Sequence, residues 1–364
     1  MGRVYNFSAG PSMLPLEVLK QAQAELTDFN NTGMSITEMS HRSKPYEEVN
    51  AEAEALLREL MGVPNDYHIL FVQGGASTQF GAVPLNLLGK NNKADYIETG
   101  NFANKAIEEA QRFGDINIAA SSKADKYTYI PRAFNFRKDA AYVHMTNNNT
   151  IFGTHFTFVP DTKGVEIVND MSSDILSEVI DVKKFGVIYA GAQKNIAPAG
   201  VTIVIAKKSL VDNPENAMKC CPTMLKWSTQ VDEKGGNSLY NTPPCFSVYM
   251  AMLVFRHLKK LGGVPAMEKT NRAKAKLLYD FIDNSKMFKS PVKKEDRSLM
   301  NIPFVTGSEE LNDKFIKEAA KSGLVTLKGH KIVGGMRASI YNAMPTEGVK
   351  ALVDFMKKFE KENK

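Results

Sequence analysis

The sequence is poor in cysteine and has no long apolar run. Its 364 residues include three cysteines, too few for a disulfide framework and without metal-ligand spacing: Cys220, Cys221 and Cys245. The apolar run at residues 201–206 stops at Lys207, far short of the ~20 apolar residues that a membrane-spanning helix needs. The first seven residues lack the apolar core of a signal peptide. These absences predict a soluble, cytoplasmic protein.

The charge is only mildly one-sided. Lys and Arg number 46 against 40 Asp and Glu, which gives a formal net charge of +6. A nucleic-acid-binding protein would cluster its basic residues with interleaved aromatics. Here they alternate with acids, as in residues 357–361, which is typical of solvated helix faces. The charge pattern therefore disfavours a polymer partner. A basic surface could still steer small anionic substrates to a site, and we keep that possibility.

Short apolar segments alternate with helical ones over residues 66–206. We expect strands at residues 68–72, 94–99, 141–145, 165–168, 187–190 and 202–205. Helices are expected from the turn after residue 72 to Leu88, and over residues 102–113. Strands separated by helices indicate βαβ units and a mostly parallel sheet covered on both faces. The fold class is therefore α/β.

The pattern changes after about residue 260. A helix from Pro244 to about Leu261 meets the breaker Gly262-Gly263-Val264-Pro265. Beyond it we expect helices at residues 270–284, 309–322 and 346–362, and strands at 300–305 and 337–341. The chain also exceeds the ~250–300 residues that one core usually supports. We therefore predict a large domain at residues 13–260 and a smaller α+β domain at 261–364, on which residues 1–12 pack.

Three features point to chemistry. The glycine-rich turn at residues 73–79 lies between a strand and a helix, where backbone N–H groups can hold a phosphate. It matches neither the dinucleotide nor the nucleoside-triphosphate motif, and it could be a simple tight connection. Asp170 follows one predicted strand and Lys194 follows another. Both would lie at the carboxyl edge of the sheet, where ligands of open α/β sheets bind.

A phosphate-binding turn, a strand-end carboxylate and a strand-end lysine, in that order, suit pyridoxal 5′-phosphate. The lysine would form the Schiff base, the carboxylate would keep the pyridine nitrogen protonated, and the turn would hold the phosphate. Most lysines are simply solvated, so the prediction depends on the three features occurring together.

Longer motifs add a resemblance. They are NFSAGP at 6–11, MSHRS at 39–43, FVQGG at 71–75, DMSS at 170–173, AGAQKN at 190–195, LYNTPP at 239–244, KGH at 328–330 and GGMRAS at 334–339. With these motifs the chain resembles the phosphoserine aminotransferase family, class V members of the fold type I pyridoxal-phosphate enzymes, over nearly its whole length. The resemblance implies a seven-stranded sheet in the large domain and a homodimer with shared active sites. It also implies ping-pong exchange of 3-phosphohydroxypyruvate and L-glutamate for O-phospho-L-serine and 2-oxoglutarate in serine biosynthesis, with 4-phosphohydroxythreonine as a possible further substrate.

The resemblance also assigns residues. It implies that Lys194 is the Schiff-base lysine and proton shuttle, and that Asp170 is the partner of the pyridine nitrogen. Further cofactor contacts would come from Ala76, Ser77, Phe102, Thr150 and Gln193, and from Asn241 and Thr242 of the other subunit. Arg337 would bind the substrate α-carboxylate. The distal anion would be held by His41 and Arg42, also across the dimer, together with His330 and Lys331. No metal is implied.

Two positions depart from the usual family pattern. Phe102 stands where many members have Trp, so ring stacking is retained without an indole donor. Lys331 stands where many have Arg, so a bidentate contact becomes a point charge. The contacts of the turn at residues 75–77, which varies in the family, are expected to be mainly through the backbone.

Other interpretations stay open at this level. Without the resemblance, His41 and His330 could be surface residues and Arg337 a structural ion-pair partner. Another class V reaction, such as desulfuration or transfer from a different amino donor, is a second interpretation. Desulfuration would need a reactive cysteine, whereas we expect the three cysteines to be buried small hydrophobes. A non-catalytic anion- or nucleic-acid-binding protein would leave the order of Asp170 and Lys194 unexplained.

Overall fold

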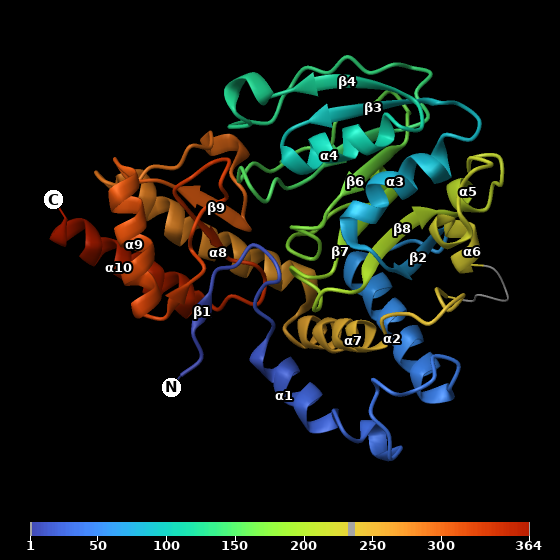
Figure 1. Cartoon of the computed structure of the whole chain (residues 1–364), viewed down its shortest axis with the longest axis horizontal. Coiled ribbons are helices and arrows are strands. Elements are labelled where there is room, and N and C mark those ends of the chain that lie inside the picture. Colours follow the sequence, from blue (N-terminus) through green and yellow to red (C-terminus); the bar gives the residue numbers. More distant parts are fainter. Residues whose placement is uncertain (1, 232–236, 364) are drawn as a thin grey trace.

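The computed structural model describes residues 2–231 and 237–363 and places a seven-stranded sheet at the centre of the chain (Figure 1). The strand order is β2-β8-β7-β6-β5-β3-β4. Only β8 runs against its neighbours, pairing antiparallel with β7 and β2, so the sheet is mostly parallel as predicted. The strands are β2 (Tyr67–Val72), β3 (Lys93–Glu98), β4 (Asp115–Ser121), β5 (Val143–Thr146), β6 (Ile167–Asp170), β7 (Val187–Gly191) and β8 (Thr202–Lys207).

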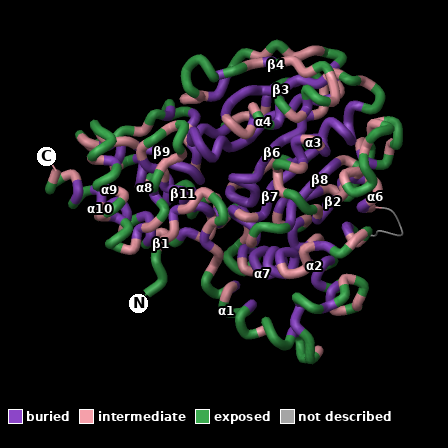
Figure 2. The backbone as a smooth tube through the Cα atoms, viewed as in Figure 1, coloured by how far each residue is buried: buried purple, intermediate pink, exposed green. Residues whose placement is uncertain are grey.

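Helices cover both faces of this sheet. The inner strands are buried along almost their whole length, as Figure 2 shows, because a doubly covered sheet has no solvent face, whereas the edge strand β4 is largely exposed or half-buried. One face packs on α2 and α7, and the other packs on α3 and α4. The helices of this part are α1 (Leu16–Glu25), α2 (Lys44–Met61), α3 (Gly75–Leu87), α4 (Asn101–Ala110), α5 (Lys208–Val211), α6 (Trp227–Val231) and α7 (Cys245–Lys260).

The C-terminal part builds a second core rich in phenylalanine. Phe288, Phe304, Phe315 and Phe359 meet there, mostly edge to face. Its elements are α8 (Gly263–Asn284), β9 (Asn301–Phe304), α9 (Glu309–Lys321), β10 (Leu324–Val325), β11 (Met336–Ser339) and α10 (Thr346–Glu362). β9 and β11 pair antiparallel, and the N-terminal strand β1 (Tyr5–Asn6) pairs in parallel with β10.

The junction between the two cores runs along α8. Val264 and Met267 pack in the first core, whereas Leu278 and Ile282 pack in the second. The division at residue 260 therefore stays a proposal, and Met1 and Lys364 of the proposed domains lie outside the described residues. No helix of the described ranges is long and apolar enough to cross a membrane.

Three local predictions were wrong. The helix predicted to end near Leu261 does end there, but the next helix, predicted from residue 270, already begins at Gly263, directly after Gly262 in a left-handed conformation. The strand β4 was missed, since its burial is irregular at the sheet edge. Cys220 is exposed, and Cys221 and Cys245 are partly buried rather than buried.

Candidate active site

A cleft of about 460 Å³ opens at the carboxyl ends of the parallel strands. The strand order reverses at β3, because the next two strands of the chain, β4 and β5, lie on opposite sides of it. Ligands of α/β proteins bind at such a reversal. Nine of the predicted residues line the cleft: Ala76, Ser77, Phe102, Thr150, Asp170, Gln193, Lys194, His330 and Arg337.

Lys194 follows β7, and its amine points into the cleft. The Nζ atom donates a 2.9 Å hydrogen bond to the Thr150 hydroxyl and lies 5.5 Å from the centre of the Phe102 ring. Burial lowers the pKa of Lys194 to about 8, although Asp170 and Asp174 nearby act in the other direction. An amine with such a pKa is partly unprotonated near neutral pH, so it can act as a nucleophile or base.

Asp170 is the last residue of β6 and is almost fully buried. Burial raises the pKa of its carboxyl, opposed by the backbone N–H of Ser172, which donates to Oδ1 at 2.9 Å, and by Lys194. The sequence placed Asp170 beyond a strand at 165–168, but β6 extends two residues further. The carboxylate thus stands on the sheet itself.

The turn before α3 presents backbone donors to the same cleft. Gly74 has φ +98°, and a Cβ atom there would lie 1.8 Å from the Thr78 hydroxyl, so only glycine fits. In the described part of the chain no side chain caps α3, which leaves first-turn N–H groups free for an anion. Gly75 N is already used, donating to Thr202 Oγ1 at 2.7 Å.

Arg337 enters the cleft from β11. Its Nη1 donates to the Thr150 carbonyl at 3.2 Å, and its Nε is buried with no hydrogen-bond partner among the described residues. A buried unpaired guanidinium N–H is costly, so this atom fits an anionic group that the cleft would receive. Burial lowers the pKa of His330, and the positive charge of Arg337 beside it acts in the same direction.

Five predicted residues lie outside this cleft. His41 is half-buried and Arg42 is exposed, both before α2, and Lys331 is exposed beside His330. Asn241 lines a separate cavity of about 370 Å³ that also borders Gly74 and Thr78. The carbonyl of Thr242 accepts a 3.2 Å hydrogen bond from Gln73 in the glycine-rich turn before α3. Within one chain, then, the structure does not bring His41, Arg42, Lys331, Asn241 or Thr242 to the cleft.

Sequence reasoning missed Lys105 and Tyr189. Lys105 lines the cleft one helical turn after Phe102, with its Nζ 5.9 Å from the ring centre; the i, i+3 spacing could have found it. Tyr189 is the cross-strand neighbour of Asp170. This proximity to Asp170 depends on the register of β6 and β7, which the sequence pattern does not predict.

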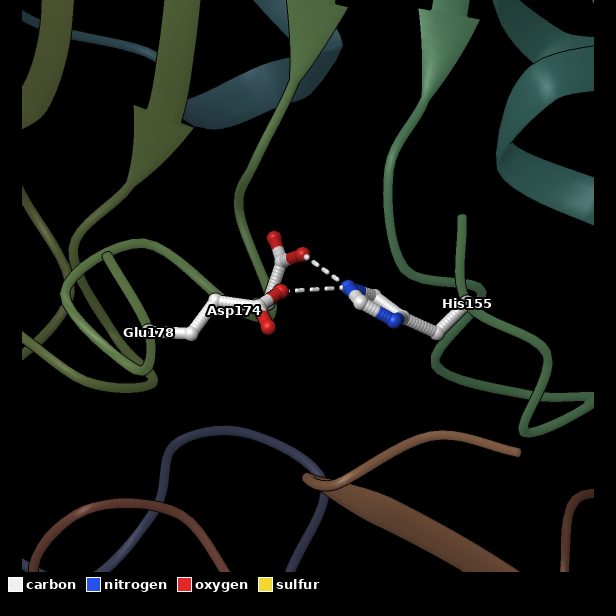
Figure 3. A group of neighbouring side chains, drawn as sticks. All are labelled: His155, Asp174 and Glu178. Carbon is white, nitrogen blue, oxygen red and sulfur yellow. Dashed lines mark ion pairs between the residues drawn. The ribbon is translucent and has the colours of Figure 1, made fainter. Parts of the chain in front are cut away.

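A second polar group lies beside the site and has the geometry of an ion pair. Both carboxylates of Figure 3 approach the same nitrogen of His155, with Nε2 2.7 Å from Glu178 Oε1 and 3.5 Å from Asp174 Oδ2. The 2.7 Å separation of His155 Nε2 and Glu178 Oε1 is that of a direct N–H···O hydrogen bond. It favours an ion pair over a site in which both atoms bind one metal ion. Burial alone would lower the pKa of His155, but its bonds to both carboxylates outweigh burial and raise it to about 10. This direction of shift favours a charged imidazolium of His155, paired with both Glu178 and Asp174.

Comparison with known proteins gives consistent results. The model of the aminotransferase class V family matches residues 4–352. The chain is 55% identical to phosphoserine aminotransferase of Bacillus cereus over the full length of both proteins, and 50% identical to that of Nitrosomonas europaea over 99% of both. Among solved structures, phosphoserine aminotransferase from Bacillus circulans subsp. alkalophilus superposes with a TM-score of 0.96 at 49% identity, covering 100% of this chain and 99% of that one. The pyridoxal-phosphate-bound phosphoserine aminotransferase from Trichomonas vaginalis gives 0.93 at 40% identity, covering 98% and 100%.

Proposed function

The chain belongs to the class V aminotransferases, and from that membership we propose that it transfers the amino group of L-glutamate to 3-phosphohydroxypyruvate, forming O-phospho-L-serine and 2-oxoglutarate for serine biosynthesis. One observation carries the proposal. A buried amine, a buried carboxylate and an arginine whose Nε has no partner among the described residues line one cleft, in a chain that matches phosphoserine aminotransferases over its whole length.

The residues of the cleft fit pyridoxal 5′-phosphate, the cofactor of this family. When bound, the cofactor supplies the electron sink that makes the substrate α-proton removable. Lys194 would hold it covalently, and the start of α3 with Ala76 and Ser77 would hold its phosphate. Phe102 would stack on its ring, with Thr150 and Gln193 as further contacts, and Asp170 would face its pyridine nitrogen.

Each step of the exchange then depends on a residue of this chain. Lys194 Nζ, partly unprotonated near neutral pH, takes the proton from the α-carbon of L-glutamate in the first half-reaction, and in the second it delivers a proton to the α-carbon that becomes that of O-phospho-L-serine. Arg337 binds the α-carboxylate that both amino-acid substrates share, through charge-assisted hydrogen bonds. Fixing that carboxylate presents the α-carbon to the amine.

The distal anion of the substrate requires a second set of cations. His330 and Lys105 line the cleft, and Lys331 follows His330. We propose that His41 and Arg42 complete this set from a second copy of the chain, where Asn241 and Thr242 would also reach the cofactor phosphate. The exposed apolar side chains of Met34 and Tyr240, close in sequence to these residues, support such a homodimer.

The cysteines bear on the cellular location and on the reaction type. The three cysteines are free thiols, which fits a reducing cytoplasm. None of them is among the described residues that line the cleft, which disfavours desulfuration. Use of 4-phosphohydroxythreonine stays a prediction.

The visible absorption band of the cofactor-loaded protein tests the function. L-phosphoserine should bleach the band and 2-oxoglutarate should restore it, because the two half-reactions run in sequence. A band that ignores phosphoserine would remove the substrate assignment and leave the cofactor. A protein that takes up no pyridoxal phosphate would contradict both.

A further inference from the structure

Three asparagine side chains bind three consecutive backbone carbonyls in the segment between β6 and β7. They come from distant parts of the chain, namely the residue after Lys194, the turn after β11, and α8. Each side chain donates from its Nδ2 atom to one carbonyl of the segment. The bonds run from Asn195 to Ile175 at 3.0 Å, from Asn342 to Leu176 at 2.9 Å and from Asn271 to Ser177 at 2.9 Å. We call Asn195, Asn342 and Asn271 the asparagine ladder.

The members of the ladder also bond to one another. The backbone N–H of Asn342 donates to Asn195 Oδ1 at 3.0 Å, and Asn271 Nδ2 donates to Asn342 Oδ1 at 2.8 Å. Because a carbonyl only accepts, each amide must turn its nitrogen toward the segment, which leaves the oxygens of Asn195 and Asn342 to accept from the next member. These contacts fix the orientation of every amide in the ladder.

The carbonyl segment holds a strained residue. Leu176 is buried and has φ +62°, a left-handed conformation that is uncommon for leucine. Such a conformation persists where the surrounding structure holds it in place. Here the ladder binds the carbonyl of Leu176 and those of both its neighbours. The ladder therefore binds the segment where its backbone is strained.

The ladder joins the two cores. Leu176 packs in the first core. Ile340 and Met344, on either side of Asn342, pack in the second. Asn195 and Asn342 also line a cavity of about 560 Å³ whose other walls come from both cores. Apolar packing between the cores is therefore incomplete beside the ladder, and hydrogen bonds carry the contact there.

Lys274 holds the turn that carries Asn342. It lies on α8 about one helical turn after Asn271, and its side chain is fully buried. Its amine donates to three backbone carbonyls of the turn, those of Ile340 at 3.1 Å, Tyr341 at 2.9 Å and Met344 at 3.0 Å. A buried amine is costly unless it is hydrogen-bonded, so this contact and the ladder together fix the turn.

The ladder lies beside the two groups that a substrate would meet. Asn195 directly follows Lys194. Asn342 comes five residues after Arg337, just beyond the end of β11. Inside the cleft the two groups already share a contact with Thr150, so the ladder is a second link between them, outside the cleft. Since a misplacement of about 1 Å near reacting groups can cost about 100-fold in rate, a shift of the turn would slow the reaction.

We propose that Asn195 and Asn342 are positioning residues. Through the asparagine ladder they set where Arg337 stands relative to the Lys194 amine, and thus how well the substrate α-carboxylate fits. Neither asparagine is among the described residues that line the cleft, so each acts through the groups that it holds. The inference rests on the proposed function, because it takes Arg337 as the residue that binds the α-carboxylate.

A double-mutant cycle tests this role, with every variant followed as single-turnover bleaching of the cofactor band. Asn342→Ala should lower kcat/KM for L-glutamate and O-phospho-L-serine alike by about tenfold or more, because both carry an α-carboxylate. Its affinity for pyridoxal phosphate should stay unchanged. In an Arg337→Ala background the same change should cost less than about threefold. Equal losses in both backgrounds would mean a general structural role and would overturn the proposal.

Two further variants complete the comparison. Asn271→Ala removes a ladder member that is distant in sequence from both reacting groups, and it should show the same pattern as Asn342→Ala. Asn312→Ala is the control, because the Asn312 side-chain oxygen accepts from the Thr306 backbone N–H at 2.9 Å within the second core. It should lower stability and leave kcat/KM unchanged. If Asn312→Ala lowers kcat/KM as much as Asn342→Ala does, the ladder has no particular role.

Hydrogen exchange of the cofactor-loaded protein tests the ladder without turnover. The backbone amide of Asn342 should exchange about tenfold or more faster in Asn195→Ala, because its acceptor is gone, whereas Asn312→Ala should leave its rate unchanged. An unchanged rate in Asn195→Ala would show that the ladder does not hold the turn. Faster exchange in a protein that leaves phosphoserine unreacted would count against the proposed function and not against the ladder.

Discussion

The amine of Lys194 donates to the side chain of Thr150, 44 residues earlier in the chain, at 2.9 Å. The backbone carbonyl of the same threonine accepts from Arg337 at 3.2 Å. Thr150 thus stands between the amine on the central sheet and the guanidinium on β11. This contact fixes the spacing of the two groups that a substrate would meet together, one at its α-carbon and one at its carboxylate.

The buried amine should make the cofactor-free protein more stable at high pH. The pKa of Lys194 is about 8 when folded and 10.5 in the unfolded chain, so between these values the unfolded state binds more protons and stability rises with pH. Lys194→Met removes this effect. The variant should therefore gain stability relative to the unchanged protein, and this gain in the free energy of unfolding should be about 2 kcal/mol larger at pH 7 than at pH 10.

Denaturant unfolding at several pH values measures this difference. Lys328→Met, at an exposed position, serves as the control because its amine stays in water. A difference for Lys194→Met that is constant from pH 7 to 10 would mean that the amine is not desolvated.

Sharing of active sites between subunits predicts complementation. Lys194→Ala and Arg42→Ala should each be nearly inactive alone, the first without its reacting amine and the second with a raised KM for the anionic substrates. In a mixed dimer, one site combines the intact Lys194 of one chain with the intact Arg42 of the other. Since half of randomly assorted dimers are mixed, about a quarter of full activity should return. No recovery after unfolding and refolding the mixture would place Arg42 in its own chain's site or outside it.

Neutralising the buried carboxylate should slow proton removal. Asp170→Asn keeps the shape and the Ser172 bond, but it cannot hold a proton from the cofactor nitrogen. We expect kcat to fall about 100-fold or more, as general acid–base and electrostatic groups contribute on this scale. The kinetic isotope effect with α-deuterated glutamate should increase. An unchanged isotope effect would show that Asp170 does not act in that step.

The turn before α3 should tolerate no side chain at residue 74. A Cβ atom at Gly74 would collide with Thr78 and strain a left-handed backbone, displacing the donors at the start of α3. Gly74→Ala should weaken pyridoxal phosphate binding tenfold or more in a fluorescence titration. Gly164→Ala provides the control, because φ there is +91° but the space is open. If the two variants bind equally well, the turn does not position the phosphate.

The fold could be predicted where hydrophobic pattern and breakers agree. The strand at residues 187–190 and the helix at 346–362 match β7 and α10 within a residue, because their apolar periodicity is strong. β4 was missed since an edge strand needs no regular pattern. The reversed direction of β8 was not predicted either, because strand polarity depends on pairing rather than on local sequence.

For the site, the order of a turn, a carboxylate and a lysine predicted that the turn, Asp170 and Lys194 would meet. The resemblance supplied the other assigned residues, and nine of all those assigned share one cleft. Tyr189 could not be found, because its link to Asp170 comes from register across two strands. Whether His41 and Arg42 reach a site in another chain depends on the contact between two subunits, and no local sequence pattern predicts that contact. Those two assignments stay predictions that the complementation experiment addresses.

The pairing of β1 with β10 has a consequence for the order of folding. Tyr5 is opposite Leu324, so residues made first during synthesis acquire their partner only when most of the chain has been made. Between that strand and α1, Ser12 N donates to the carbonyl of Gln193 at 3.0 Å, and Gly10 lies against the Lys194 side chain. The catalytic pocket is therefore closed late in biosynthesis, and a nascent chain stalled before residue 324 would carry the central sheet with one wall of its pocket still unanchored.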